Sequence, residues 1–437
     1  MKEKKFGIIL PIILVSYFLI LLDNSIVFTS SLKIAQELHL DSQMTAWVSN
    51  AYALTFGGFI IFGGRMGDIF GRKRIFLIGI SIFSICSLLV GLAQSGPMII
   101  AARAAQGLGS AILAPTTLAL LMDNYQGKRR SQAIAYYGAT TGIGASVGLV
   151  IGGLIASYAS WRWGFFLNFP LGLVLAVLTS LKIPQSKTVS QKMDWGGTLL
   201  SVLGLTSLIA GINLKAQGVW FLIAAVIFLI LFLFQEKRTA HPLMPLSLFA
   251  DSERTSAYLA RFTDTAAMTS YLFLTPQVMQ QVLNWTPLMA AFGFLPQMLL
   301  QFLTASMVNK LAQKWDHTFL SLIGAVIFAS GMFIGIFLPV QNGYVIGLLL
   351  PLVLTGLGQG LIMGPLTISS VARTNEQIAG AASGTLNMAQ QIGSSFGLSL
   401  IVTLTTNYHQ QLIIMTFFAV ILIVAVSVMH WSAKRHK

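Results

Sequence analysis

Charged residues are scarce in this chain of 437 residues: Asp, Glu, Lys and Arg make up 9% of it, and only 13 residues are acidic. A soluble protein devotes about a quarter of its residues to these four types, because water must hydrate its surface. Here 55% of the residues are hydrophobic and the mean hydropathy is +0.77. A water-soluble fold is therefore excluded, and most of the surface must face lipid.

Cysteine is nearly absent, since Cys86 is the only one, and this excludes an intrachain disulfide and a thiolate metal site. The six histidines are scattered without the spacing of metal ligands. The chain also lacks a G-x-x-x-x-G-K-[ST] loop, which argues against an ATP-driven pump. We expect no cofactor, no metal and no catalytic residue; an integral membrane enzyme is the disfavoured alternative.

Long apolar runs dominate the sequence instead, and fourteen of them are long enough to cross a bilayer as helices that satisfy their own backbone. They are expected near residues 7–30, 44–66, 75–95, 97–121, 131–157, 163–183, 195–214, 217–235, 255–282, 288–309, 317–340, 343–370, 378–405 and 410–432. The first run is too long for a signal peptide and contains Asp23, so we interpret it as an uncleaved helix. The sequence predicts an all-α integral membrane protein.

The net charge of +14 is explained by retention of Lys and Arg at one membrane face rather than by nucleic acid binding. With the N-terminus inside, 22 of the 27 basic residues fall on the cytoplasmic side. Only Lys33, Arg162 and Lys215 fall outside, while Arg103 and Arg261 lie within spans. This asymmetry predicts that both termini are cytoplasmic.

A weak internal repeat appears at an offset of 245 residues. It aligns Arg65 with Lys310, Gly79 with Gly324, Gly148 with Gly393, and Gly152 with Gly397. Such a trace is typical of transporters built from parallel repeats around a central cavity. We expect a six-helix bundle in residues 1–185, a linker with two additional helices in 186–254, and a second six-helix bundle in 255–437.

The loop after the second span carries the most specific motif, Gly64-Arg65-Met66-Gly67-Asp68-Ile69-Phe70-Gly71-Arg72-Lys73-Arg74, and it resembles the signature loop of the major facilitator superfamily. Further segments resemble the fourteen-span drug:proton antiporters of that superfamily. They are Leu22-Asp23-Asn24-Ser25-Ile26-Val27, Arg103 to Gly109, Gly144-x3-Gly148-x3-Gly152-Gly153, Trp161 to Gly172, Asp194, His241-Pro242-Leu243, and Gly380 to Gly384.

This resemblance implies the major facilitator fold and proton-driven efflux of hydrophobic, often cationic drugs by alternating access. It implies small-molecule drugs, the lipid bilayer and protons, as the coupling ion, as partners, and a monomer in a bacterial plasma membrane. The alternative is an exporter of a single metabolite or lipid. The sequence departs from the family's motifs at two places. Leu149 replaces the usual Pro of the motif in the fifth span, and residues 28–32 replace the usual continuation of the motif in the first span.

For the loop after the second span, the resemblance implies a conformational latch across the two bundles. Gly64, Gly67 and Gly71 lack a Cβ and permit close approach of a neighbouring helix. Asp68 is suited to pair with Arg72 or to face a helix N-terminus. The alternative is a merely basic cytoplasmic turn, which Asp68 does not fit.

Two acidic residues, Asp23 and Asp264, are expected deep inside spans. A carboxyl group in low dielectric favours its neutral form, which suits reversible protonation. Asp23 has no basic residue within a turn of its helix, so it is our first candidate for proton coupling, whereas Arg261 could neutralise Asp264 as an i, i+3 pair. Arg103 must find partners or reach the interface, and the resemblance makes it a tuner of the embedded carboxylate.

Small residues at spacing four in the fifth span, Gly144, Gly148, Gly152 and Gly153, form a groove for another helix. Packing alone explains them; the resemblance adds a contact with the opposite bundle that limits leakage. Polar groups within spans generally face the bundle interior. The candidate substrate cavity therefore comprises Asn24, Tyr136, Tyr137, Gln277, Gln280, Asn387 and Gln390.

Overall fold

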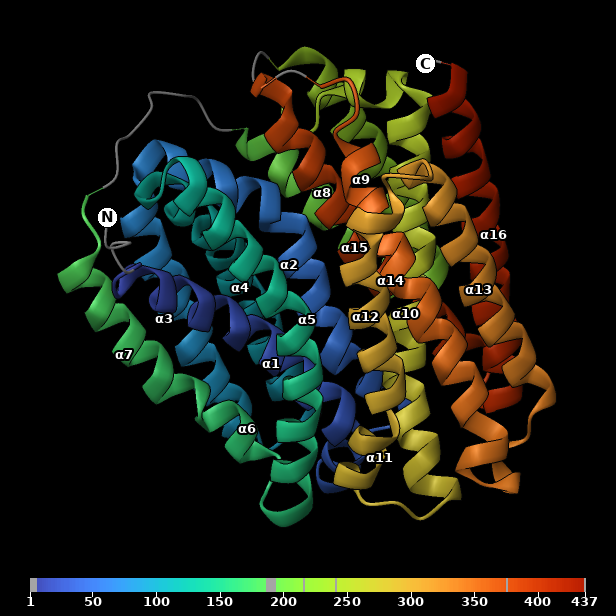
Figure 1. Cartoon of the computed structure of the whole chain (residues 1–437). Coiled ribbons are helices and arrows are strands. Elements are labelled where there is room, and N and C mark those ends of the chain that lie inside the picture. The colour runs from blue at the N-terminus through green and yellow to red at the C-terminus, as the bar shows by residue number, and fades with distance from the viewer. Residues whose placement is uncertain (1–5, 186–193, 215–216, 240–241, 375, 436–437) are drawn as a thin grey trace. The chain divides into compact units, whose positions relative to one another are not determined.

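The computed structural model describes residues 6–185, 194–214, 217–239, 242–374 and 376–435. Among these residues all regular secondary structure is helical (Figure 1). The chain divides into two compact units, Met1–Thr198 and Leu199–Lys437. Lys215, which was assigned to an outside loop, and His241 of the motif before the ninth expected span lie outside the described residues.

The first unit contains six long helical segments, the last of which is broken in two. They are α1 (Ile9–Glu37), α2 (Ser42–Phe70), α3 (Arg72–Gly91), α4 (Gly96–Asn124), α5 (Gly127–Tyr158), and α6 (Arg162–Phe166) with α7 (Asn168–Lys182). Helix α4 packs against α2, α3 and α1, while α1 also packs against α5 and α7. Helix α4 is therefore central to the unit, and α1 lies beside it.

The second unit begins within α8 (Trp195–Asn213) and continues with α9 (Gly218–Arg238) and the 3-10 turn η1 (Leu246–Ala250). Its remaining elements are α10 (Ser252–Val282), α11 (Pro287–Gly293), α12 (Leu295–Leu311), α13 (His317–Phe337), η2 (Val340–Asn342), the π-helical turn η3 (Val345–Leu349), α14 (Leu350–Ser370), α15 (Glu376–Leu404) and α16 (Tyr408–Arg435). Helix α10 packs against α14, α15 and α16.

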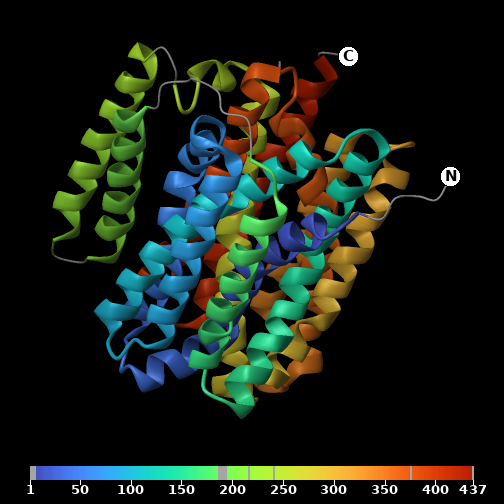
Figure 2. The ribbon, with the colours of Figure 1, turned by 90° about the vertical axis from the view of Figure 1, so that its left-hand side faces the viewer.

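Helices α8 and α9 form a hairpin (Figure 2), which glycines allow to pack closely. A Cβ on Gly204 would lie 2.9 Å from the Leu229 side chain, and one on Gly218 would lie 2.4 Å from the Gly211 carbonyl oxygen. Most of the outer surface of α9 consists of exposed large apolar side chains. This composition suits contact with lipid acyl chains.

Eleven helical segments in the described part of the chain are long and apolar enough to cross a membrane. Each of the fourteen expected segments coincides with a helix or with consecutive helical pieces. Helix α10 is not among the eleven; it carries Glu253, Arg254, Arg261 and Asp264 in its first half and several Thr, Ser and Gln residues in its second. The count of fourteen spans and the predicted domain limits stay predictions.

The internal repeat is confirmed in the way the helices of each unit pack. A Cβ on Gly79 of α3 would contact Leu113 of α4, and one on Gly324 of α13 would contact Ile362 of α14. In the same way α5 packs on α1, and α15 packs on α10. The weak 245-residue offset therefore reflects two units with the same order of helix contacts.

Candidate functional site

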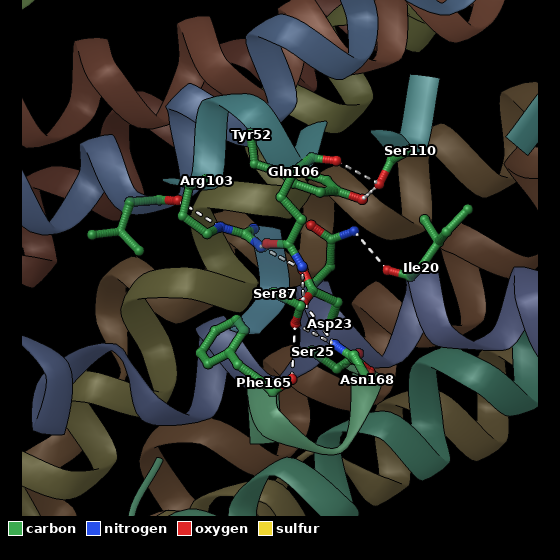
Figure 3. Close-up of polar contacts among 12 residues, drawn as sticks. Ile20, Asp23, Ser25, Tyr52, Ser87, Arg103, Gln106, Ser110, Phe165 and Asn168 are labelled. Carbon is green, nitrogen blue, oxygen red and sulfur yellow. Dashed lines mark hydrogen bonds and ion pairs between the residues drawn. The ribbon is translucent and has the colours of Figure 1, made fainter. Parts of the chain in front are cut away.

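An ion pair inside the first unit joins α1 to α4. The side chains of Asp23 and Arg103 are both fully buried, and Arg103 Nη1 donates to Asp23 Oδ2 (Figure 3). Their meeting follows from the packing of α1 against α4. In hydrocarbon such a pair is far less costly than either charge alone.

Two amide side chains complete the shell around Asp23. Gln106 Nε2 donates to Asp23 Oδ1 at 2.7 Å, and Asn168 Nδ2 donates to the same oxygen at 3.1 Å. Gln106 also accepts from Arg103 Nη1 at 2.8 Å. Asn168, from the first turn of α7, also donates to Ser87 Oγ of α3 at 3.0 Å. The carboxylate therefore accepts hydrogen bonds from side chains of two other helices.

Arg103 is held on its other sides by α2. Its Nε donates to the Val48 carbonyl oxygen at 3.1 Å, and its guanidinium carbon lies 4.2 Å from the centre of the Tyr52 ring. Tyr52 in turn donates to Ser110 Oγ at 2.7 Å. A cation over an aromatic face gains further electrostatic stabilisation. Arg103 therefore does not extend to the outer interface, and the alternative based on snorkelling is wrong.

Asp23 was expected to be the isolated embedded carboxylate, and the structure corrects this. Its own helix supplies no cation, but α4 supplies Arg103. Inspection of one helix at a time does not reveal a partner that lies 80 positions away in the sequence. This network, with its buried Asp23–Arg103 contact and two amide groups, is suited to holding these side chains in place.

The second embedded carboxylate, Asp264 on α10, is fully buried and has a different environment. It accepts a hydrogen bond from Gln359 Nε2 of α14 at 3.3 Å. Arg261 does not form an ion pair with it among the described residues. The Arg261 guanidinium instead contacts Met363 and donates to Thr367 Oγ1 at 3.2 Å. The intrahelical pair considered from the sequence is therefore not formed.

The glycine motif that was expected to form a loop instead forms the end of α2, Gly71 and the start of α3, and a cluster of three charged residues lies there. Arg72 Nη2 lies 2.9 Å from Asp68 Oδ1, and Arg72 Nη1 lies 2.5 Å from Asp123 Oδ1 at the end of α4. Gly71, with φ of +93°, separates α2 from α3, a conformation that favours glycine. A Cβ on Gly67 would lie 3.1 Å from the Thr116 side chain, and one on Gly64 would lie 3.5 Å from Pro115. This segment is thus fastened to α4.

The glycine stripe of α5 faces α1. A Cβ on Gly144 would contact Leu21, one on Gly148 would lie 2.9 Å from Ser25 Oγ, and one on Gly152 would lie 3.0 Å from the Ile26 Cα. Gly153 is buried. These contacts fit the packing interpretation, since α1 lies in the groove at these three positions; the expected contact of the stripe with the opposite bundle stays a prediction.

The candidate cavity residues do not share one environment. Tyr137 stacks on Tyr17 with ring centres 4.2 Å apart, whereas half of the Tyr136 side chain is exposed and its ring contacts Phe6. The amide groups of Asn24, Gln277 and Gln280 donate to backbone carbonyls of their own helices. Asn387 is exposed, and the backbone oxygen of Gln390 accepts from Thr265. Their assignment to a substrate cavity stays a prediction.

Some residues of these networks were missed by the sequence interpretation. Asn168 was quoted only as part of a motif, although an amide within an apolar segment signals a buried polar partner. Asp123 was assigned to a cytoplasmic segment without a partner. Ser87 and Tyr17 carry no signal of their own, since single hydroxyl groups are common within membrane helices.

A second charge cluster lies before α10, outside the apolar spans. Arg373 lies 2.6 Å from Asp251 Oδ2 and 2.9 Å from Glu253 Oε2, while Asp251 also caps α10 by accepting from the Arg254 backbone N–H. Burial raises the pKa of Asp251, but the hydrogen bonds from Arg373 and Arg254 outweigh it, so the pKa lies below its ordinary value. The same contacts raise the pKa of Arg373.

Comparison with known proteins identifies relatives along most of the chain. A family model described as Major Facilitator Superfamily matches residues 13–398 and again 257–437. The uncharacterized MFS-type transporter EfpA of Mycobacterium tuberculosis is 31% identical over 88% of this chain and 74% of its own length. The puromycin resistance protein pur8 of Streptomyces alboniger is 33% identical (91% and 81%), and the cephamycin export protein CmcT of Amycolatopsis lactamdurans is 32% identical (89% and 83%).

Solved structures show the same fold. The POT family transporter PepTSo superimposes with a TM-score of 0.72 at 16% identity, covering 99% of both chains. At this identity the likeness concerns the fold alone.

Proposed function

Because the chain belongs to the major facilitator superfamily, whose members are transporters and not enzymes, we propose that it is a proton-coupled multidrug efflux antiporter. It exports hydrophobic, often cationic drugs by alternating access. Relatives named for puromycin resistance and cephamycin export support this substrate class. The coupling proposal rests on one observation, that each unit has a fully buried aspartate in a long helix. Asp23 lies in α1, the first helix of its unit, and Asp264 lies in α10, the first long helix after the α8–α9 hairpin.

The proposed architecture has fourteen spans: six in residues 1–185, two in the 186–254 segment, and six in 255–437. Both termini lie in the cytoplasm of a bacterium, and the chain acts as a monomer in the plasma membrane. The helical segments at each expected position support this arrangement, as does the concentration of Lys and Arg on one side.

The Arg72 cluster is the proposed conformational latch. Its ion pairs with Asp68 and Asp123 fix the cytoplasmic ends of α2, α3 and α4 as one block. A block of this kind can move as a rigid element when a transporter changes its access. The close contact of α5 with α1 then keeps the helix that carries Asp23 in a fixed register.

The energy source in this proposal is the proton gradient. One proton that moves down 100 mV releases about 2.3 kcal/mol, to which the pH difference adds. Exchange of a proton for a cationic drug requires a buried acidic group that the two ligands occupy alternately. Exchange of a proton for a neutral drug and exchange of a proton for a cationic drug then differ in the net charge that crosses the membrane.

Transport by everted membrane vesicles tests this function. Vesicles that contain the protein should accumulate the fluorescent cation ethidium when a pH gradient is imposed, and should lose it when the gradient is collapsed. Vesicles without the protein are the control. The alternative function would be favoured if accumulation of ethidium and of several unrelated drugs did not depend on the pH gradient while one metabolite or lipid was exported.

A further inference from the structure

Aromatic rings join the start of α13 to the end of α16 in the second unit. The ring of Trp315, just before α13, stacks on that of Phe319, with ring centres 5.1 Å apart, and Phe319 in turn lies 5.6 Å from the ring of His430 on α16. Thr318 Oγ1 lies 2.8 Å from His430 Nδ1. The two helices lie side by side (Figure 1). Trp315 remains exposed at the outer edge of this contact.

The last turn of α16 places two cations beside these rings. Side chains four positions apart share one face of a helix, so Lys434 lies one turn beyond His430, past the start of α13. The guanidinium carbon of Arg435 lies 3.4 Å from the centre of the Trp431 ring, and 55% of the Trp431 side chain is exposed. Both cations are exposed as well. Helix α16 therefore ends in an exposed cation–aromatic pair next to α13.

The turn between α12 and α13 adds further positive charge. Lys310, in the last turn of α12, and Lys314, directly before Trp315, are both exposed. Among the described residues, neither these two lysines nor the two cations of α16 belong to an ion pair. Asp316 is the single acidic residue between α12 and α13, and the buried Glu253 on the far side of His317 pairs with Arg373. The surface thus keeps an excess of cations.

This surface lies where two membrane spans end. Both α13 and α16 are long and apolar enough to cross a bilayer, and they expose large apolar side chains along their length, among them Val326, Val424 and Val428. Exposed tryptophan rings favour the level of the lipid headgroups. Basic side chains next to a span attract anionic lipids electrostatically. Cations at the headgroup level, with apolar helix faces below them, complement one kind of molecule, an anionic phospholipid.

We propose that Lys314, Lys434 and Arg435 form a binding site for the headgroup of an anionic phospholipid, with Trp315 and Trp431 beside it. The lipid belongs to the leaflet on the side where both termini are proposed to lie. Its phosphate oxygens accept charge-assisted hydrogen bonds from the ammonium and guanidinium groups, and its acyl chains lie along α13 and α16. The bound lipid connects the turn before α13 to the end of α16. This inference does not depend on the proposed drug transport.

The first test measures quenching of tryptophan fluorescence by phospholipids that carry bromine near the headgroup. The full-length protein is reconstituted in phosphatidylcholine bilayers with a low mole fraction of brominated phosphatidylglycerol. The signal of Trp315 and Trp431 is the part that is lost in Trp315→Phe/Trp431→Phe. We expect this signal to be quenched several-fold more than by brominated phosphatidylcholine at the same mole fraction. Equal quenching by the two lipids would overturn the inference.

The second test removes the cations. The triple variant Lys314→Gln/Lys434→Gln/Arg435→Gln should lose the preference for phosphatidylglycerol, by up to roughly five-fold for each cation that contacts the lipid. Lys314→Arg/Lys434→Arg keeps both charges and should keep the preference. High salt should weaken the preference of the wild type, because it screens exposed charges. A preference that survives in the triple variant would overturn the inference.

A second cation–aromatic pair provides the matched control. Arg238 at the end of α9 lies 4.5 Å from the centre of the Phe234 ring, and Lys237→Gln/Arg238→Gln should leave the quenching of Trp315 and Trp431 unchanged. A loss as large as that in the triple variant would show a general effect of charge and contradict a site at α13 and α16. Displacement of the brominated lipid by inorganic phosphate would assign the cations to a free anion instead. Rings shielded from both lipids in a dimeric protein would assign the surface to a second copy of the chain, and either result overturns the inference.

Discussion

The two embedded carboxylates lie in similar helix frameworks but have different surroundings. Asp23 accepts hydrogen bonds from Arg103, Gln106 and Asn168. Among these three residues one donor, Arg103 Nη2, and one acceptor, Asn168 Oδ1, have no hydrogen-bond partner. Asp264 accepts one hydrogen bond, from Gln359, and its own Oδ1, Gln359 Oε1 and Arg261 Nε have no hydrogen-bond partner. The buried carboxylate of the first unit is thus held by several donors, and that of the second unit by one.

This difference shows that helix packing and polar chemistry vary independently in the two units. Close glycine contacts fix both frameworks: Gly148 lies against α1, and Gly393 lies against α10. Within those frameworks Asp23 belongs to a buried ion pair, while Asp264 has no cation within ion-pair distance among the described residues and interacts with the charge of Arg261 one turn away. A buried ion pair is suited to maintain structure.

Removal of the two acids should have unequal effects on stability. Asp23→Leu leaves the Arg103 guanidinium buried without a counter-ion, and breaking a buried pair in this way costs about 3–5 kcal/mol. Asp264→Leu removes one weak hydrogen bond and a costly carboxyl group, so its effect should be much smaller. Thermal unfolding of the purified proteins in detergent measures both.

The double variant Asp23→Leu/Arg103→Leu is the control for this contrast, because it removes both charges and should recover part of the lost stability. Equal destabilisation by the two single leucine variants would contradict the comparison between the units.

Close helix contacts provide the next test. A Cβ on Gly393 would lie 2.2 Å from the Phe262 carbonyl oxygen, whereas one on Gly148 would lie no closer than 2.9 Å to Ser25 Oγ, 3.0 Å to Ser25 Cβ and 3.2 Å to Leu22 Cα. We expect Gly393→Ala to cost roughly 1–3 kcal/mol through overpacking and Gly148→Ala to cost less. Gly380→Ala, with nothing within 4 Å, is the matched control. Thermal unfolding of the purified variants measures these losses of stability. A loss for Gly380→Ala as large as that for Gly393→Ala would contradict the packing explanation.

Sequence patterns predicted the helices well because each membrane helix must satisfy its own backbone and is apolar over about 20 residues. They also identified Asp23, Asp264 and Arg103, since charges in such segments stand out. Partners could not be predicted in the same way. The Asp23–Arg103 pair and the Gln359 contact depend on the rotation of α1, α4, α10 and α14 about their axes, which hydropathy does not determine.

The loop cluster of the first unit should affect transport more than stability. Asp68→Asn removes one acidic partner of Arg72, while Asp123 remains. Because nearly half of the Asp68 side chain is exposed, the stability loss should stay within about 1 kcal/mol. Ethidium efflux should nevertheless fall several-fold if the cluster is a latch, with normal expression and ethidium binding. Arg129→Gln is a control for loss of one charge on the same side; undiminished efflux by Asp68→Asn would contradict the latch.

The smallest effect is expected at the cluster before α10, which lies outside the apolar spans and responds to pH in part through Asp251. Since the folded protein lowers the pKa of Asp251 below its ordinary value of 3.8, the unfolded chain binds the proton more readily. The contacts with Arg373 and the Arg254 N–H therefore contribute fully above that ordinary value, and the contribution is lost as the pH falls through the folded pKa. Hydrogen exchange at the first turn of α10, corrected for intrinsic rates, should accelerate only in that acidic range. Asp251→Asn should show faster exchange already at neutral pH and a smaller further change on acidification. The amide does not titrate there, whereas Glu253, whose pKa is lowered despite its burial by hydrogen bonds with His317, Ser369 and Arg373, still does. Unchanged protection of this turn in acid would show that neither the Asp251 nor the Glu253 contact with Arg373 holds the start of the helix.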